Sequence, residues 1–322
     1  MRRVGVHHLK LVHAPFSNQE GEWFWTDPEM RELLAESKLY MIGQRQEVFF
    51  RNFRGVEADE GNRIVFDLEC GDEVMNDVEL PVSQFSKEAD CFEFELGEKI
   101  IRVYTLDKTK TPATRELIHW FTPDRLFYYH WRELIVTHNL EGFRKFTRFT
   151  LYYVGISKKH DSFSRLFETA HEKRSRILGN ESQIRPTARL TDELTLFLFA
   201  VTDLQVHTAG WDDDIPDNFF EGFKVPVDAM TADAEKAFVK ILQTKYNTLK
   251  YDNYPQGKDG LKSFPYSNYS FFIEEEISLD SGKDIINGAR TMWTTNPDDS
   301  PDWISVEGDS VTLIKANKSA AK

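Results

Sequence analysis

Residues 148–155 read RFTLYYVG, and this concentration of aromatic and β-branched residues is typical of a β-strand. Residues 134–140, LIVTHNL, form a second strand-like run shortly before it. The link between the two runs is short enough for a hairpin. The sequence therefore predicts a pair of antiparallel strands at the start of a folded layer.

A regular order of elements follows this hairpin. The pattern predicts a helix over residues 162–178, closed by Gly179, and then a short strand over 195–202 that is buried on both faces. A second helix is expected over 231–243. The fold class predicted from this order is α/β (α+β), with a small mixed sheet and flanking helices between residues 119 and 250.

The segments on either side are expected to be rich in strands. Residues 1–118 contain strand-like runs such as 47–53, together with one short helix over 28–40 that Asp27 caps. They are interpreted as a β-rich N-terminal domain. Residues 251–322 are rich in Tyr, Phe, Gly and Pro and end in a strand pattern, so they are interpreted as a C-terminal β extension with a tail.

The composition limits the class of protein. Of the 322 residues, 40% are hydrophobic and 29% are charged, which supports sizeable cores and excludes a disordered chain. No apolar run approaches the roughly 18 residues that span a bilayer. The N-terminus lacks the apolar core of a secretory signal. Two cysteines are too few for a zinc site or a disulfide framework. We expect a cytoplasmic protein that does not engage a membrane.

Charge is unevenly distributed along the chain. The net charge of -13 argues against a generally basic nucleic-acid binder. Residues 131–190 nevertheless hold 12 basic and 6 acidic residues. Because salt screens more distant charges, this local excess is what a polyanion would experience at close range.

Short motifs occur along the central layer in a recognisable order. Tyr153-Val154-Gly155 ends the strand, and Arg165 lies on the following helix. Glu235 lies on the second helix, and Tyr246-Asn247 closes the layer. In this order the segments resemble the GIY-YIG nuclease superfamily, with Tyr153-Val154-Gly155 matching the second half of the name motif. The resemblance is confined to residues 130–250.

The resemblance implies a metal-dependent endonuclease that hydrolyses phosphodiester bonds. Glu235 would hold Mg²⁺ or Mn²⁺, because one carboxylate with waters is a normal site for such a cation. Arg165 would contact a phosphate oxygen through its guanidinium, and Tyr153 would position or deprotonate the attacking water. The expected partner is nucleic acid, DNA rather than RNA, bound by Lys158, Lys159, Arg165, Lys173, Arg174 and Asn247.

Two positions of the family pattern are not matched. The first tyrosine, which the family is thought to use as a general base, is missing from the strand before Tyr153. His138 lies on that strand and is the candidate substitute, since an imidazole titrates near neutral pH. His171, the other catalytic candidate, comes six positions after Arg165. Six steps turn a continuous helix by about 600°, so His171 joins the site only if the helix starts late or bends.

The predicted function is a metal-dependent endonuclease, with a role in restriction or defence suggested by the resemblance alone. One alternative is a catalytically inactive GIY-YIG-like module that binds nucleic acid or protein. Another places the function in the acidic N-terminal domain, as an adaptor that recruits a protein partner.

Overall fold

The computed structural model describes residues 1–56, 62–85, 92–107, 114–168, 171–211, 215–216, 219–290 and 300–316. They form two compact units. Unit 1 comprises residues 1–45, 148–182 and 189–322, and unit 2 comprises residues 46–147 and 183–188. The chain is thus divided at other places than the boundaries at 118 and 250 that the sequence suggested, because the first and last segments of the chain join one sheet.

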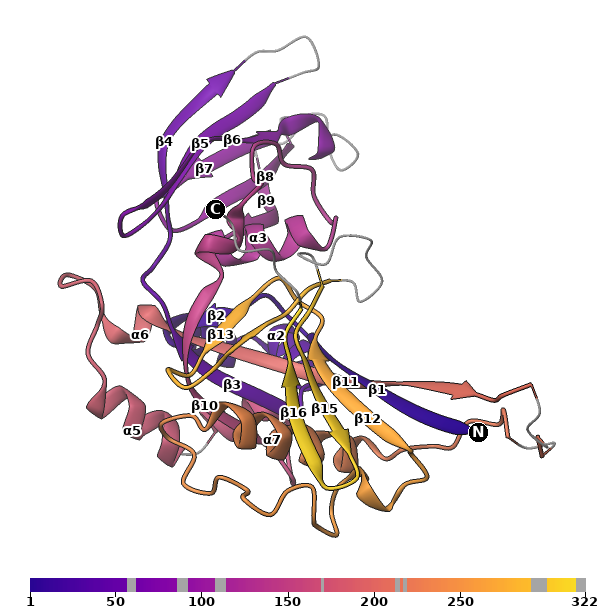
Figure 1. The fold of residues 1–322 in the computed structure, drawn as a ribbon. Helices are drawn as coiled ribbons and strands as arrows, with labels where there is room; N and C mark the ends of the chain where they lie inside the picture. The colour runs from indigo at the N-terminus through magenta and orange to yellow at the C-terminus, as the bar shows by residue number, and fades with distance from the viewer. Residues whose placement is uncertain are drawn as a thin grey trace. The chain divides into compact units, whose positions relative to one another are not determined.

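Unit 1 is built on one mixed sheet (Figure 1). Its strands are β1 (Arg2–Leu11), β2 (Phe16–Ser17), β3 (Leu39–Gln44), β10 (Arg148–Ile156), β11 (Leu194–Thr208), β12 (Asn268–Ile273), β13 (Ser278–Asp280), β14 (Ile285–Asn287), β15 (Trp303–Glu307) and β16 (Ser310–Ile314). They run in the order β14-β13-β10-β3-β11-β1-β12-β15-β16, and β2 pairs with β11. The β1–β12 and β10–β13 pairs are parallel. The mixed α/β class predicted from the sequence is therefore confirmed.

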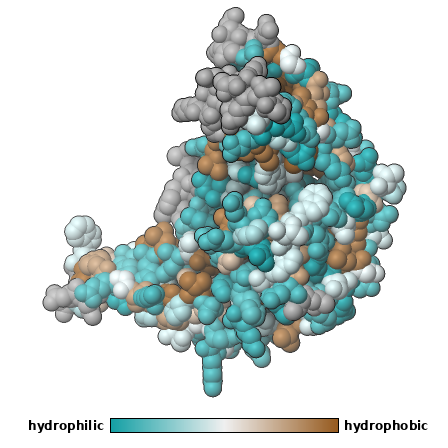
Figure 2. All heavy atoms as spheres, turned by 180° about the vertical axis from the view of Figure 1, so that it is seen from behind, coloured by the Kyte–Doolittle hydropathy of each residue, from teal (hydrophilic) through white to brown (hydrophobic). Residues whose placement is uncertain are grey.

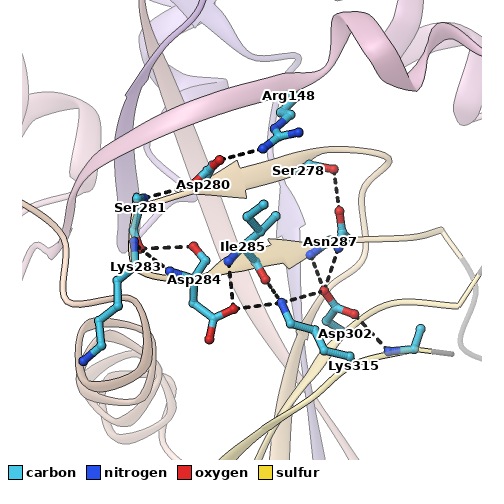
Figure 3. A network of polar contacts seen from close by, with 12 residues as sticks. Arg148, Ser278, Asp280, Ser281, Lys283, Asp284, Ile285, Asn287, Asp302 and Lys315 are labelled. Atoms are coloured by element: carbon cyan, nitrogen blue, oxygen red, sulfur yellow. Dashed lines mark hydrogen bonds and ion pairs between the residues drawn. The ribbon is translucent and has the colours of Figure 1, made fainter. Parts of the chain in front are cut away.

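The sheet curls until its two outer strands are linked by polar contacts (Figure 3). Asp302, which precedes β15 and is buried, accepts hydrogen bonds from the backbone N and the Nδ2 of Asn287 in β14, both at 2.8 Å. Lys315, just after β16, pairs with Asp284 at 3.0 Å. On the face enclosed by this curl, α7 (Val227–Leu242) packs against β10, β11, β15 and β16.

The other helices of unit 1 are α1 (Asn18–Trp25), α2 (Pro28–Leu34), α4 (Ser162–Phe167), α5 (Glu172–Asn180) and α6 (Leu190–Glu193), with a 3₁₀ turn at Leu261–Ser263. Local sequence sets several of their ends. Ser17 and Glu20 form a capping box at α1, and Asp27 caps α2 as predicted. Large buried side chains fill the core of this unit: Phe16, Tyr40, Phe149, Phe163, Phe197, Phe199 and Phe238.

Two predicted helices were wrong in their extent. The helix expected over 28–40 ends at Leu34, and the chain then enters β3. All of β3 is buried at the centre of the sheet, so tertiary packing outweighs its local helical pattern. The helix expected over 162–178 is broken into α4 and α5. The helix expected over 231–243 is confirmed as α7, which begins one turn earlier.

Unit 2 contains two antiparallel sheets of three strands each, β4-β5-β6 and β7-β8-β9. Its elements are β4 (Phe49–Val56), β5 (Arg63–Cys70), β6 (Glu73–Pro81), β7 (Phe92–Leu96), β8 (Ile101–Asp107), β9 (Thr114–Phe121) and α3 (Pro123–Trp131), with 3₁₀ turns at Val82–Phe85 and Phe143–Phe146. The strand expected over 134–140 was wrong: its contact with a neighbour is an isolated β-bridge between His138 and Glu79. The predicted hairpin with β10 therefore does not exist.

None of the described helices is long and apolar enough to cross a bilayer. On the face shown in Figure 2, hydrophilic residues predominate and hydrophobic residues lie in small groups among them. The long apolar side chains of the described strands and helices are largely directed into the cores.

Candidate functional site

Strand β3 brings a tyrosine that the sequence analysis missed next to Tyr153. β3 and β10 pair antiparallel, with Tyr40 opposite Gly155 and Ile42 opposite Tyr153. The rings of Tyr40 and Tyr153 have centroids 5.9 Å apart, and the two hydroxyl groups interact electrostatically. Tyr40 is buried, whereas Tyr153 is partly exposed. The pair thus combines a buried tyrosine with a partly exposed one.

Gly155 is the residue that allows the two rings to meet. A Cβ atom at this position would lie 2.5 Å from Cε1 of Tyr153 and 2.8 Å from the hydroxyl oxygen of Tyr40. Such distances are shorter than side chains tolerate, so any other residue would push both rings aside. The glycine of the Tyr153-Val154-Gly155 motif therefore has a steric role in this pair.

We expect Gly155→Ala to reduce any activity of this site by roughly 10²-fold, because displacement of a reacting group by about 1 Å has that effect. The added methyl group should also lower the free energy of unfolding by about 1–3 kcal/mol. Turnover and melting temperature measure the two effects. Gly179→Ala is the matched control, since a Cβ there meets no atom within 4 Å. Unchanged activity in Gly155→Ala would contradict this role for the tyrosine pair.

His171 reaches the tyrosines because the helix is interrupted. It is the N-cap of α5, and its Nδ1 accepts a hydrogen bond from the backbone N of Arg174 at 3.0 Å. Its Nε2 lies 2.8 Å from the hydroxyl oxygen of Tyr40. Burial lowers the pKa of His171 to about 4, with Arg165 and Arg174 adding to the effect. A neutral ring that accepts at Nδ1 carries its proton on Nε2, so His171 donates to Tyr40.

The carboxylate of Glu235 faces the same cluster from α7. Burial raises its pKa to about 7, although a hydrogen bond from Tyr251 (3.2 Å) and the nearby charge of Lys158 oppose the shift. In the described part of the chain, the hydroxyl of Tyr251 donates this hydrogen bond to Oε2 of Glu235. Burial raises the pKa of both Tyr153 and Tyr251, and the Glu235 charge adds to the rise. A carboxylate whose pKa is strongly shifted by burial is a candidate for a functional site.

Arg165 supplies the positive charge of the cluster. It lies on α4 with an exposed side chain. Burial raises the pKa of Tyr40 and Tyr153, and the charge of Arg165 opposes that rise. Burial lowers the pKa of His171, and Arg165 adds to the effect. In the part of the chain that the structure describes, no carboxylate forms an ion pair with its guanidinium. A guanidinium in that state can fork onto a phosphate or carboxylate oxygen.

Asn247 holds the end of the site to β10. Its Oδ1 accepts from the backbone N of Val154 at 2.9 Å, and its Nδ2 donates to the Val154 carbonyl at 2.8 Å. The backbone N of Tyr246 also donates to the carbonyl of Tyr152. Asn247 therefore has a buried supporting position behind Tyr153. Tyr152 itself donates to Oε1 of Gln44 at 2.6 Å and is not part of the cluster.

Two of the cations predicted to bind nucleic acid, Lys173 and Arg174, are engaged within the fold. Arg174 donates to Asn18 and to the carbonyl of Leu166 and pairs with Glu22, so it fixes α5 to its neighbours. Lys173 pairs with Glu172 at 3.1 Å. By contrast, Lys158 and Lys159 are exposed between β10 and α4, and Lys158 has a carboxylate only at 3.7 Å, that of Asp259. Arg165, Lys158 and Lys159 are thus the cations left near the tyrosines.

The structure places the sequence-predicted candidates in two groups. Tyr153, Arg165, His171 and Glu235 are brought together in unit 1. His138 lies in unit 2, and the hairpin that was to carry it beside Tyr153 is absent. Tyr40 was missed because it comes from a strand far upstream. The apolar run at residues 39–43, ending in Gly43, was the signal that could have identified that strand.

The donor set of the cluster is compatible with a hard divalent cation. Among the described residues, no group of three or more His, Cys, Asp or Glu side chains could hold a metal ion by itself. Burial destabilises the negative charge of the Glu235 carboxylate, so a bound cation would be favourable there. Tyrosine hydroxyls supply further oxygen atoms nearby. Mg²⁺ commonly takes one or two carboxylates and completes its shell with waters and substrate phosphates. Glu235 therefore fits such an ion.

Comparisons with models of protein families, with curated proteins and with solved structures found no match to this chain.

Proposed function

We propose that the protein is a divalent-metal-dependent endonuclease with a GIY-YIG-like site in unit 1. The proposal is supported above all by the meeting of Tyr40, Tyr153, Arg165, His171 and Glu235, which come from separate elements. In this proposal β3 and β10 correspond to the strands of the two name motifs, and Tyr40 takes the place of the missing first tyrosine. Unit 2 would then be an insertion between those strands.

Phosphodiester hydrolysis needs an activated water, a counter-charge for the phosphoryl oxygens and a frame that orients them. Glu235 would hold Mg²⁺ or Mn²⁺. Such an ion supplies Lewis-acid stabilisation of the developing negative charge and lowers the pKa of a bound water. Arg165 binds a non-bridging phosphate oxygen with its guanidinium, and Lys158 and Lys159 attract the neighbouring backbone charges.

In this proposal Tyr153 is the proton acceptor. His171 donates from Nε2 to the oxygen of Tyr40, so the Tyr40 hydroxyl proton is directed to its other neighbour, Tyr153. Burial and the charge of Glu235 raise the pKa of Tyr153, while its interaction with Tyr40 and the charge of Arg165 oppose that rise. Burial also raises the pKa of Tyr40, and its interaction with Tyr153 adds to the rise. Of the two hydroxyl groups, Tyr153 is therefore the one that loses its proton more readily. Tyr153 takes the proton of the attacking water, and His171 and Tyr40 position it.

His171 is a positioning residue in this scheme, and His171→Asn separates its two roles. Asparagine is a good N-cap and should preserve α5, but it is too short to reach Tyr40. We expect cleavage to fall by roughly 10–100-fold at neutral pH and the rising limb of the pH–rate profile to move to higher pH, because the phenolate loses support. Rate profiles and circular dichroism measure these effects. A normal profile would mean that His171 serves only as a helix cap.

The function is tested by incubating the full chain with supercoiled plasmid and with single-stranded DNA and RNA, in Mg²⁺, Mn²⁺ or EDTA. Nicking or linearisation that requires the metal and disappears in Glu235→Gln supports the proposal. Binding without cleavage under every metal would replace it with the binding-module alternative. Reversing the charge of Lys158 and Lys159 should weaken binding equally for all sequences and reduce its salt dependence.

A further inference from the structure

A cavity of about 480 Å³ lies beside the catalytic cluster in unit 1. Its walls are the first turns of α7, the segment that follows Tyr153 in β10, and the loop that ends at Phe264. Thr231 and Glu235 are four residues apart on α7, so they occupy one face of the helix, one turn from each other. The cavity therefore lies one helical turn away from the proposed metal ligand.

The lining combines apolar surface with hydroxyl groups, two lysines and two aspartates, Asp228 and Asp259. Ile156, Ala229, Ala232 and the ring of Phe264 supply the apolar walls. Lys158 and Lys258 supply positive charge. Its volume falls in the range of small-molecule sites, roughly 300–1,000 Å³, and is far too small for a double helix. An aromatic ring beside positive charge is the usual way in which proteins hold an unstacked base and its phosphate.

Two further observations concern polar groups in the wall of this cavity. Thr231 lines the cavity, is 2% exposed, and carries a hydroxyl without a hydrogen-bond partner in the described part of the chain. The N-terminus of α7, a helix of 16 residues, has no side-chain cap at Pro226, and it contributes Pro226, Asp228 and Ala229 to the lining. Buried hydroxyls are normally satisfied, so a ligand that offers hydrogen-bonding groups would complete this wall.

Lys158 connects the cavity with the cluster. It lines the cavity, and its charge also acts on the carboxylate of Glu235. Asp259, which lines the cavity too, has its carboxylate engaged by Lys236 as well as by Lys158. A phosphate at Lys158 would therefore lie between the proposed metal ligand and the cavity.

We infer that this cavity holds one unpaired nucleotide of the substrate strand, with its base against Phe264 and its phosphate at Lys158, next to the phosphate that is cut. The inference rests on the proposed function and specifies its substrate: strands with an unpaired or extruded nucleotide rather than continuous duplex. Extrusion of a base costs least where the base is already unpaired, so such sites would be selected.

Binding tests this without requiring cleavage. The full-length Glu235→Gln protein is titrated with a duplex that carries one unpaired 2-aminopurine, and with the same duplex fully paired. We expect fluorescence quenching by stacking and roughly tenfold tighter binding of the unpaired form, because base–aromatic stacking contributes about 1–3 kcal/mol. Ser263→Trp, placed on the exposed rim, should fill the cavity and remove both effects, whereas Ser310→Trp on β16 should not.

The outcomes distinguish this inference from the proposed function. Equal affinity for both duplexes, or a preference that persists in Ser263→Trp, overturns the inference even if the wild type cuts plasmid. A preference that Ser263→Trp removes supports it even if no cleavage is found. Deoxyadenosine monophosphate is added as a competitor: if it binds the cavity while the unpaired duplex shows no advantage, the occupant is a free nucleotide and the strand inference is wrong.

Discussion

The Glu235→Gln variant is expected to lose cleavage and to gain stability at the same time. Glutamine keeps the size and the hydrogen-bonding capacity of the side chain but removes the charge that a Mg²⁺ ligand needs. Metal-ion catalysis contributes several kcal/mol to transition-state stabilisation, so we expect a loss of roughly 10³-fold or more. A variant that cuts normally would rule out Glu235 as the metal ligand.

The gain in stability follows from the sign of the pKa shift. The pKa of Glu235 rises from 4.5 to about 7 in the folded protein. Between these values the folded state binds more protons than the unfolded state, so the free energy of unfolding falls as pH rises from 4.5 to 7. Glutamine removes this cost. The gain should be on the order of 2–3 kcal/mol at pH 8 and close to zero at pH 4.

Thermal unfolding at the two pH values measures this difference, and titration with Mg²⁺ adds a readout that is independent of cleavage. The metal should raise the melting temperature of the wild type at pH 8 and leave Glu235→Gln unchanged, since a ligand stabilises only the state that binds it. Glu168→Gln, at the exposed end of α4, is the control for loss of a carboxylate. A Mg²⁺ effect that survives in Glu235→Gln would place the ion elsewhere.

Tyr153→Phe is expected to reduce the cleavage rate by roughly 10²–10⁴-fold, the usual contribution of a general base. Tyr40→Phe should cause a smaller loss, because it removes the hydroxyl that opposes the rise in the pKa of Tyr153 but leaves the acceptor in place. Since the two hydroxyls act as a unit, the double variant should be little worse than Tyr153→Phe alone.

Single-turnover rates at saturating metal measure these losses, with Tyr152→Phe as the matched control. Tyr152 is the preceding residue of β10, and its hydroxyl bonds to Gln44 outside the cluster. Removal of the Tyr152 hydroxyl should lower the melting temperature and leave the cleavage rate nearly unchanged. If Tyr152→Phe proved as damaging to cleavage as Tyr153→Phe, the assignment of the proton acceptor would be wrong.

Local sequence patterns were sufficient for the parts of the site that depend on neighbouring residues. Arg165 on a helix after Tyr153, and Glu235 on the last long helix, follow from periodicity and order in the chain. The same holds for Asp27 as the cap of α2. Each of these features depends on residues only a few positions apart, so a single stretch of sequence is enough to predict it.

Features that depend on distant segments could not be predicted in this way. Tyr40 lies on β3, which pairs with β10 although the two strands are more than 100 residues apart in sequence. Unit 2 lies between them along the chain. The β3 run carries a local pattern compatible with the end of a helix, and only burial between β10 and β11 makes it a strand. The placement of α5 likewise involves distant residues, since Arg174 is held by Asn18 and Glu22 of α1.

The position of unit 2 between β3 and β10 has a consequence for the order of folding. In a chain with a short hairpin, the two tyrosine-bearing strands would meet within microseconds. Here residues 46–147 separate them, and closing a flexible loop of that length costs about 3 kcal/mol more than closing a four-residue turn. Gln44 and Thr150 lie opposite each other in the ladder, so unit 2 begins and ends at adjacent points. Prior folding of unit 2 would remove most of that entropic barrier, so we expect the strands that carry Tyr40 and Tyr153 to pair after unit 2 has folded.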